Sequence, residues 1–102
     1  MLGGASKWPF FQLAIVITAF QVAAIGLVIG THSWGMEPPV PLVKLNPLWA
    51  HFGQNNVLVP ASWFDGVGQA TTWRAGVNMM VWSAIQWIGA ALVFDFMRQQ
   101  SQ

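Results

Sequence analysis

The sequence has no cysteine and no tyrosine, and only 7% of its 102 residues are charged. Without cysteine the chain cannot form a disulfide, a thiolate metal site, an iron–sulfur cluster or a covalently attached c-type haem. About a quarter of the residues of a soluble domain are charged, so this chain has too few charges for an ordinary polar surface. Its net charge of +1, without any run of Lys or Arg, argues against nucleic-acid binding.

Two long apolar runs occupy residues 10–30 and 75–98. At about 1.5 Å of rise per residue, a helix of about 21 residues crosses a hydrocarbon core of about 30 Å. The first run is longer than a signal-peptide core and no A-x-A-like site follows it, so we expect a retained helix. The sequence therefore predicts an all-α membrane protein: a two-transmembrane-helix hairpin with a long irregular, partly amphipathic interfacial loop. The expected segments are an interfacial lead (1–9), transmembrane helix 1 (10–30), an extramembrane Pro/Trp-rich loop (31–74), transmembrane helix 2 (75–98) and a polar tail (99–102).

The loop is broken by proline, which excludes a continuous helix there. Residues 38–41, with three prolines, are expected to be extended. Pro47 is expected to open a short helical turn capped by Asn46. Residues 53–56 are typical of a turn, 57–59 of a short extended piece, and 62–66 of a brief helix or turn.

Polar and small residues within the two runs are candidates for helix packing. Gln21 and Gln86 both fall near the bilayer midplane, and the simplest prediction is that they pair with each other. Either amide could instead bond to a neighbouring helix or a cofactor. Gly26 and Gly30 form a GxxxG pair that permits close helix approach, although Gly30 could simply end its helix. Asn78 is expected at the interface, where water would satisfy it.

Charged and aromatic residues of the second run give two more predictions. Asp95 and Arg98 are three residues apart and are expected to pair on one helix face. Trp82 and Trp87 are five residues apart, which turns them about 140° from each other around the helix. One of the two must then face outward, to lipid or to a cofactor or another subunit.

The two histidines are the candidate cofactor ligands. His32 stands near Trp34, and His51 near Trp49. A neutral imidazole can ligate haem iron or chlorophyll magnesium, and a nearby indole can stack on such a ring. The alternative is a solvated interfacial histidine. Two histidines fall short of a zinc ligand set, so no metal site is expected. We predict no intrinsic cofactor, only contact with chlorophyll or bacteriochlorophyll, carotenoid, quinone or haem of a partner complex.

Known catalytic signatures such as G-x-S-x-G, H-E-x-x-H and a Gly-rich phosphate loop are absent from the sequence, so we expect no enzyme. The leading hypothesis is a small accessory subunit of an energy-converting membrane complex, photosynthetic (reaction-centre or light-harvesting) first and respiratory second, by analogy. Expected partners are other integral-membrane subunits and lipid, with no nucleic acid and no soluble substrate. The alternative is a homo-oligomeric pore or holin-like protein, and a membrane-anchored binding module ranks third.

The expected location is a bacterial inner (intracytoplasmic) membrane with both termini in the cytoplasm. Lys7 and Arg98 lie with the termini, whereas Lys44 and Arg74 lie in the loop. The positive-inside count is therefore even, and it does not decide the orientation.

Overall fold

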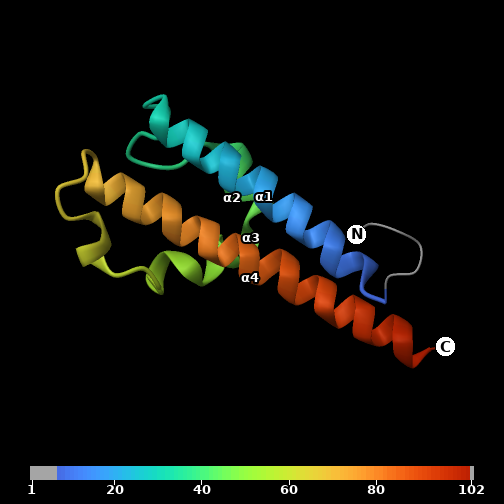
Figure 1. Cartoon of the computed structure of the whole chain (residues 1–102). Coiled ribbons are helices and arrows are strands. Elements are labelled where there is room, and N and C mark those ends of the chain that lie inside the picture. Colours follow the sequence, from blue (N-terminus) through green and yellow to red (C-terminus); the bar gives the residue numbers. More distant parts are fainter. Residues whose placement is uncertain (1–6, 102) are drawn as a thin grey trace.

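Two long helices, α1 (Pro9–Gly30) and α4 (Ala70–Gln100), dominate the computed structural model, which describes residues 7–101. They lie side by side and antiparallel, so the start of α1 meets the end of α4 (Figure 1). Both are long and apolar enough to cross a membrane. The described part of the chain has helices and no strand, so the predicted all-α class is confirmed. Residues 1–6 of the predicted lead and residue 102 of the predicted tail lie outside it.

The long helices begin where the local chemistry favours a start. Pro9 occupies the first turn of α1, where its missing N–H costs no hydrogen bond. Helix α4 begins at Ala70, five residues before the predicted bound of residue 75, directly after Gln69 in the left-handed conformation (φ +59°). His32, just past α1, has the same positive φ. The Gln69 amide nitrogen and His32 Nδ1 lie 3.0 Å apart and link the two helix ends.

The connecting segment, residues 31–69, contains four short helical elements joined by irregular stretches. They are α2 (Val40–Leu45), α3 (Pro47–His51) and the 3-10 turns η1 (Gly53–Asn55) and η2 (Ala61–Phe64). The helix opened by Pro47 and the brief helix near residue 62 agree with the sequence predictions. The segment folds back along the long helices and reaches about the middle of α4 before it returns (Figure 1).

Two local predictions for this segment are wrong. Residues 38–41 are not all extended, because α2 begins at Val40 with Pro41 in its first turn, a position that tolerates proline. Asn46 sits at the N-cap position of α3, but its side chain makes no capping bond there. Its Nδ2 donates instead to the Leu42 carbonyl at the end of α2 (2.7 Å).

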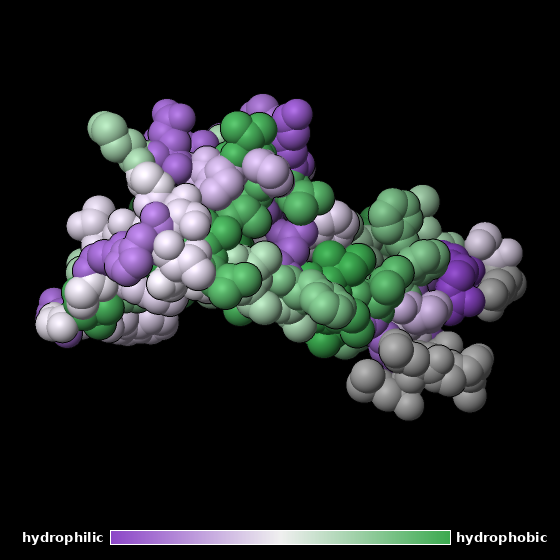
Figure 2. Space-filling model, turned by 90° about the horizontal axis from the view of Figure 1, so that it is seen from above, coloured by the Kyte–Doolittle hydropathy of each residue, from purple (hydrophilic) through white to green (hydrophobic). Residues whose placement is uncertain are grey.

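The hydrophobic core lies at the end of the hairpin where the connecting segment packs. It unites side chains of α1, α4 and the segment: Ile25, Ile29, Trp34, Leu42, Trp49 and Met79. Towards the termini the two long helices contact each other and leave apolar side chains exposed, which Figure 2 shows as a hydrophobic band on one face. The molecule therefore has a packed half and a half whose apolar surface is uncovered.

Candidate functional site

Four α4 side chains spaced four residues apart, Arg74, Asn78, Trp82 and Gln86, bond to the backbone of the connecting segment. Residues four apart follow one another along one side of a helix, and we call this row the α4 ladder. Its partners are backbone groups of a segment with little regular structure. The ladder therefore replaces hydrogen bonds that regular secondary structure would otherwise supply.

The two amides of the ladder each hold a donor and an acceptor. Asn78, which is almost fully buried, donates from Nδ2 to the Gly53 carbonyl (2.9 Å) and accepts at Oδ1 from the Leu58 N–H (2.9 Å). Gln86 donates from Nε2 to the Leu45 carbonyl (3.0 Å) and accepts at Oε1 from the Leu48 N–H (3.1 Å). The segment is thus fixed on both sides of α3.

The other two ladder residues donate one bond each. Arg74 Nε donates to the Val59 carbonyl (2.8 Å), and Trp82 Nε1 donates to the Asn56 carbonyl (2.9 Å). Close packing reinforces them, because a Cβ at Gly53 would lie 2.7 Å from Trp82 Cδ1 and 2.9 Å from Trp49 Cδ1. Real Cβ atoms do not approach that closely, so this position favours glycine.

The ladder fixes how far the segment reaches along the hairpin. Asp95 of α4 contacts the first turn of α1, and Gly76 packs against Ile29 near its last turn. Gln86 is nine residues before Asp95 and ten residues after Gly76. At a rise of about 1.5 Å per residue it lies about 14 Å from the first level and about 15 Å from the second. The start of α3 therefore lies level with the middle of α1.

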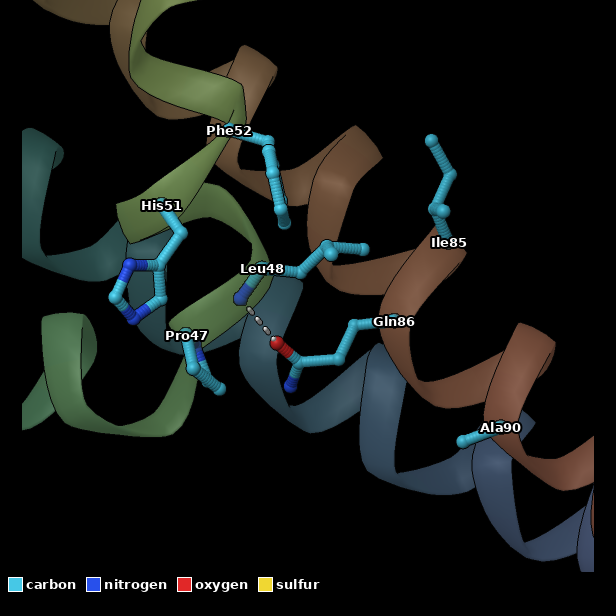
Figure 3. Close-up of a pocket in the computed structure, with 7 residues that line it drawn as sticks. All are labelled: Pro47, Leu48, His51, Phe52, Ile85, Gln86 and Ala90. Atoms are coloured by element: carbon cyan, nitrogen blue, oxygen red, sulfur yellow. Dashed lines mark hydrogen bonds between the residues drawn. The ribbon is translucent and has the colours of Figure 1, made fainter.

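A groove of about 450 Å³ opens beside Gln86, between α3 and α4 (Figure 3). Its lining is mainly apolar and consists of Pro47, Leu48, His51, Phe52, Ile85, Gln86 and Ala90. In Figure 3 the His51 imidazole forms one edge, and Ile85 and Ala90 lie across from it. Gln86 is held by its bonds to Leu45 and Leu48, whereas the described residues give the His51 ring no hydrogen bond.

The remaining predicted cofactor residues do not gather at this groove. His32, at the start of the connecting segment, contacts Gln69 at its end, away from the groove. Trp34 and Trp49 are buried in the hydrophobic core, at 9% and 6% exposure, and they pack against protein side chains. Neither indole lines the groove beside Gln86. His51 lines the groove beside Gln86, whereas Trp49 lines a separate hollow of about 290 Å³ with Val43 and Gln54.

The predicted pairing of Gln21 with Gln86 is wrong. Gln21 is buried and its Oε1 accepts a bond from the Ser83 hydroxyl (3.0 Å). Gln86 points to the connecting segment, because the ladder side of α4 differs from the side that faces α1. Asn78, expected in interfacial water, is buried for the same reason.

The close approach between α1 and α4 occurs at Gly76, where a Cβ would overlap the Ile29 side chain. A Cβ at Gly26 would meet only Met80 Cε, at 3.9 Å, and one at Gly30 would meet nothing within 4 Å. The GxxxG pair is therefore not what brings these two helices together. Its role against a further helix stays a prediction.

Both tryptophans of the α4 interior are half-buried within the hairpin. Trp82 faces the connecting segment, as its bond to Asn56 requires. Trp87 lines a small cavity with α1 residues including Phe10 and Ala14, and its buried Nε1 has no hydrogen-bond partner among the described residues. The expectation that one of these indoles must face outward is wrong, because two different elements cover the two sides of α4.

Asp95 caps α1 instead of pairing with Arg98 as predicted. Its carboxylate is fully buried and accepts from the Phe10 N–H (3.1 Å) and the Phe11 N–H (2.9 Å). These amides belong to the first turn, where N–H groups lack helical partners and a negative charge is favoured by the helix dipole. Arg98 and Gln99 both donate to the Lys7 carbonyl. The terminal end of the hairpin is therefore closed by α4 side chains.

Metal-binding chemistry of the usual kind has no candidate here, since the part of the chain that the structure describes holds no group of three or more His, Cys, Asp or Glu residues that could bind an ion. No family model, curated protein or solved structure matches the chain. The α4 ladder and the groove beside it are therefore the features of this chain that bear on its function.

Proposed function

We propose that this chain is a structural subunit of a larger integral-membrane assembly, inserted as a helical hairpin. The first support is the exposure of its apolar helices. Only 22% of the apolar window of each long helix is buried. Phe20 and Leu27 of α1 are 73% and 67% exposed. A core helix of a soluble protein would be mostly covered, so these surfaces require lipid or apolar protein.

The observation that carries the proposal is the depth of the connecting segment. With α1 across the bilayer, residues 44–51 lie near the midplane, because Leu45 and Leu48 bond to Gln86. These residues belong to the short helices α2 and α3, whose terminal N–H and C=O groups lack helical partners. At that depth such groups are tolerated only where protein or a water-filled cavity covers them. Lys44 and His51 are exposed on this segment, and ionisable groups avoid hydrocarbon. Other subunits therefore cover this side of the hairpin.

A second contact surface is consistent with the same function. Ala19, Ala23 and Gly30 are exposed along one side of α1. Gly26 on the same side is half-buried, and a Cβ there would meet Met80 of α4. A groove of about 360 Å³ lies beside Phe20 and is lined by Ile15, Val16, Ala19 and Ala23. Small residues let another transmembrane helix approach closely. On this proposal the GxxxG pair packs against a transmembrane helix of another subunit.

The hairpin fixes the relative placement of the two termini. Two spans put both termini on the same side, and we assign that side to the cytoplasm of an inner or intracytoplasmic membrane. The assembly we favour is an energy-converting complex. His51 is exposed beside an apolar groove, and a neutral imidazole can ligate the haem iron or chlorophyll magnesium that such complexes hold.

Purification of the full-length tagged chain from its native membranes in mild detergent tests the proposal. We expect several different subunits of defined stoichiometry to co-purify. A chain that purifies alone, as a monomer or as a homo-oligomer, would contradict the proposal, and the homo-oligomer would favour the pore.

A matched pair of variants tests the α1 surface. Ala23→Leu adds bulk to the small-residue side, whereas Ala24→Leu makes the same change one residue on, about 100° around the helix. Both alanines are exposed. Loss of the partner subunits in Ala23→Leu alone is expected. Equal retention in both variants would rule out close packing on this surface.

A further inference from the structure

The groove between α3 and α4 combines three properties that point to one class of ligand. It is open, its lining is mainly apolar, and its free polar group is the His51 imidazole. The Phe52 ring lies beside that imidazole with ring centroids 6.4 Å apart. Grooves of about 300–1,000 Å³ suit small-molecule ligands, and this one has about 450 Å³.

His51 lies at a depth in the proposed membrane where its imidazole needs a ligand or a hydrogen-bond partner. This step rests on the proposed function, because it requires α1 to span the bilayer. His51 ends α3, whose start is bonded to Gln86 near the midplane. A ring nitrogen at that depth lacks water, and residues 7–101 give it no hydrogen bond. Polar groups without a partner are costly in hydrocarbon.

The donor set decides what kind of partner fits. A bare cation needs three or four protein ligands, and no such group occurs among residues 7–101. A quinone would be oriented by donors at both of its carbonyls, but the Gln86 amide is already engaged with Leu45 and Leu48. A single free imidazole is what a metal needs when a macrocycle already supplies its four equatorial ligands.

We propose that the groove binds a metal-centred tetrapyrrole, with His51 as its axial ligand. The flat apolar ring would lie against the side formed by Ile85 and Ala90, and its second face would contact lipid or a neighbouring subunit. Haem and chlorophyll-type pigments share this chemistry, so the experiment has one arm for each.

The test is a titration of the purified full-length chain in detergent with iron protoporphyrin IX and, separately, with a magnesium chlorin. Axial imidazole binding shifts the main absorption band of either ring. We expect a saturable shift with one ring per chain for the wild type in at least one arm, and that arm identifies the source. His51→Ala should abolish the shift. His32→Ala should retain it, because His32 lies with Gln69 away from the groove.

A second variant separates loss of the ligand from loss of the fold. Ala90→Phe fills the groove and leaves His51 unchanged, while Ala24→Phe adds the same ring to the outer surface of α1. Binding should fail in the first and persist in the second, with equal helix content by circular dichroism. Binding by His51→Ala that matches the wild type, or no binding by the wild type in either arm, would overturn the proposal. Because the titration uses the isolated chain, its result is independent of which subunits co-purify from native membranes.

Discussion

Helices α1 and α4 are both apolar enough to cross a membrane, but they have different roles in the molecule. α1 contacts α4 on one side, through Gln21 and a set of apolar side chains, and leaves much of its remaining surface exposed. α4 faces α1 on one side and binds the connecting segment through its ladder on another. α4 is therefore a scaffold helix, and α1 is a helix that packs on it. The scaffold is the less apolar of the two. Polar residues at four-residue spacing mark the scaffold.

Removal of the most buried ladder amide should give the largest effect. Asn78→Ala leaves the Gly53 carbonyl and the Leu58 N–H without partners in a buried site. Each unsatisfied group costs about 1–3 kcal/mol, so we expect the two to lower the free energy of unfolding by about 2–6 kcal/mol. Unfolding by SDS titration in mixed micelles measures it. Asn55→Ala, at an exposed position, is the control, and equal losses in both variants would contradict the role of the ladder.

Close packing between the ladder and the connecting segment gives the next effect. Gly53→Ala places a Cβ against the rings of Trp82 and Trp49, which are held by packing on both sides. Overpacking of this kind costs about 1–3 kcal/mol. Gly89→Ala is the matched change in α4, with nothing within 4 Å of the new Cβ, and it should leave stability unchanged or slightly raised. The reverse order of stability would be inconsistent with the observed packing.

The cap that α4 supplies to α1 should matter less. Asp95→Ala removes the acceptor of the Phe10 and Phe11 N–H groups, and lost N-terminal caps cost about 1–2 kcal/mol. Amide hydrogen exchange should accelerate in the first turn of α1 and not at its last turn. Asp65→Ala, at an exposed carboxylate of the connecting segment, should change neither. Uniform acceleration along α1 would mean that Asp95 stabilises the whole hairpin rather than one helix end.

The polar contact between the two long helices should give the smallest effect. Gln21→Leu breaks the bond from Ser83, and interhelical bonds in membranes average about 0.6 kcal/mol. Ser83→Ala should cost about the same, and the double variant should cost less than the sum of the two. Strict additivity would show that these side chains do not stabilise each other.

The sequence predicts the long helices well and their partners poorly. Length and apolar composition are properties of each run alone, so both helices were predicted close to their observed bounds. The pairing of Gln21 with Gln86 depended on the faces that the two helices present to each other, and hydropathy does not contain that information. Ser83, a small residue one turn earlier, occupies the position that Gln86 was expected to hold.

The α4 ladder is visible in the sequence only as a spacing. Arg74, Asn78, Trp82 and Gln86 differ in chemistry, and their partners are backbone groups, which leave no side-chain signature. A row of polar residues at intervals of four in an apolar helix is nevertheless a usable signal for a covered face. The three-residue spacing of Asp95 and Arg98 predicts a local pair, whereas nothing in the sequence indicates that Asp95 meets the start of a distant helix.

Cysteine labelling tests directly whether the connecting segment reaches the middle of the membrane along α4. The chain has no native cysteine, so single substitutions report without background. Leu45 and Val67 are both partly exposed on the isolated chain, at 51% and 42%, but Leu45 lies level with Gln86 and Val67 lies near the start of α4. In native membrane vesicles of both orientations, an impermeant maleimide should label Val67→Cys from one side and Leu45→Cys from neither. Labelling of Leu45→Cys as fast as Val67→Cys in the folded protein would contradict the account.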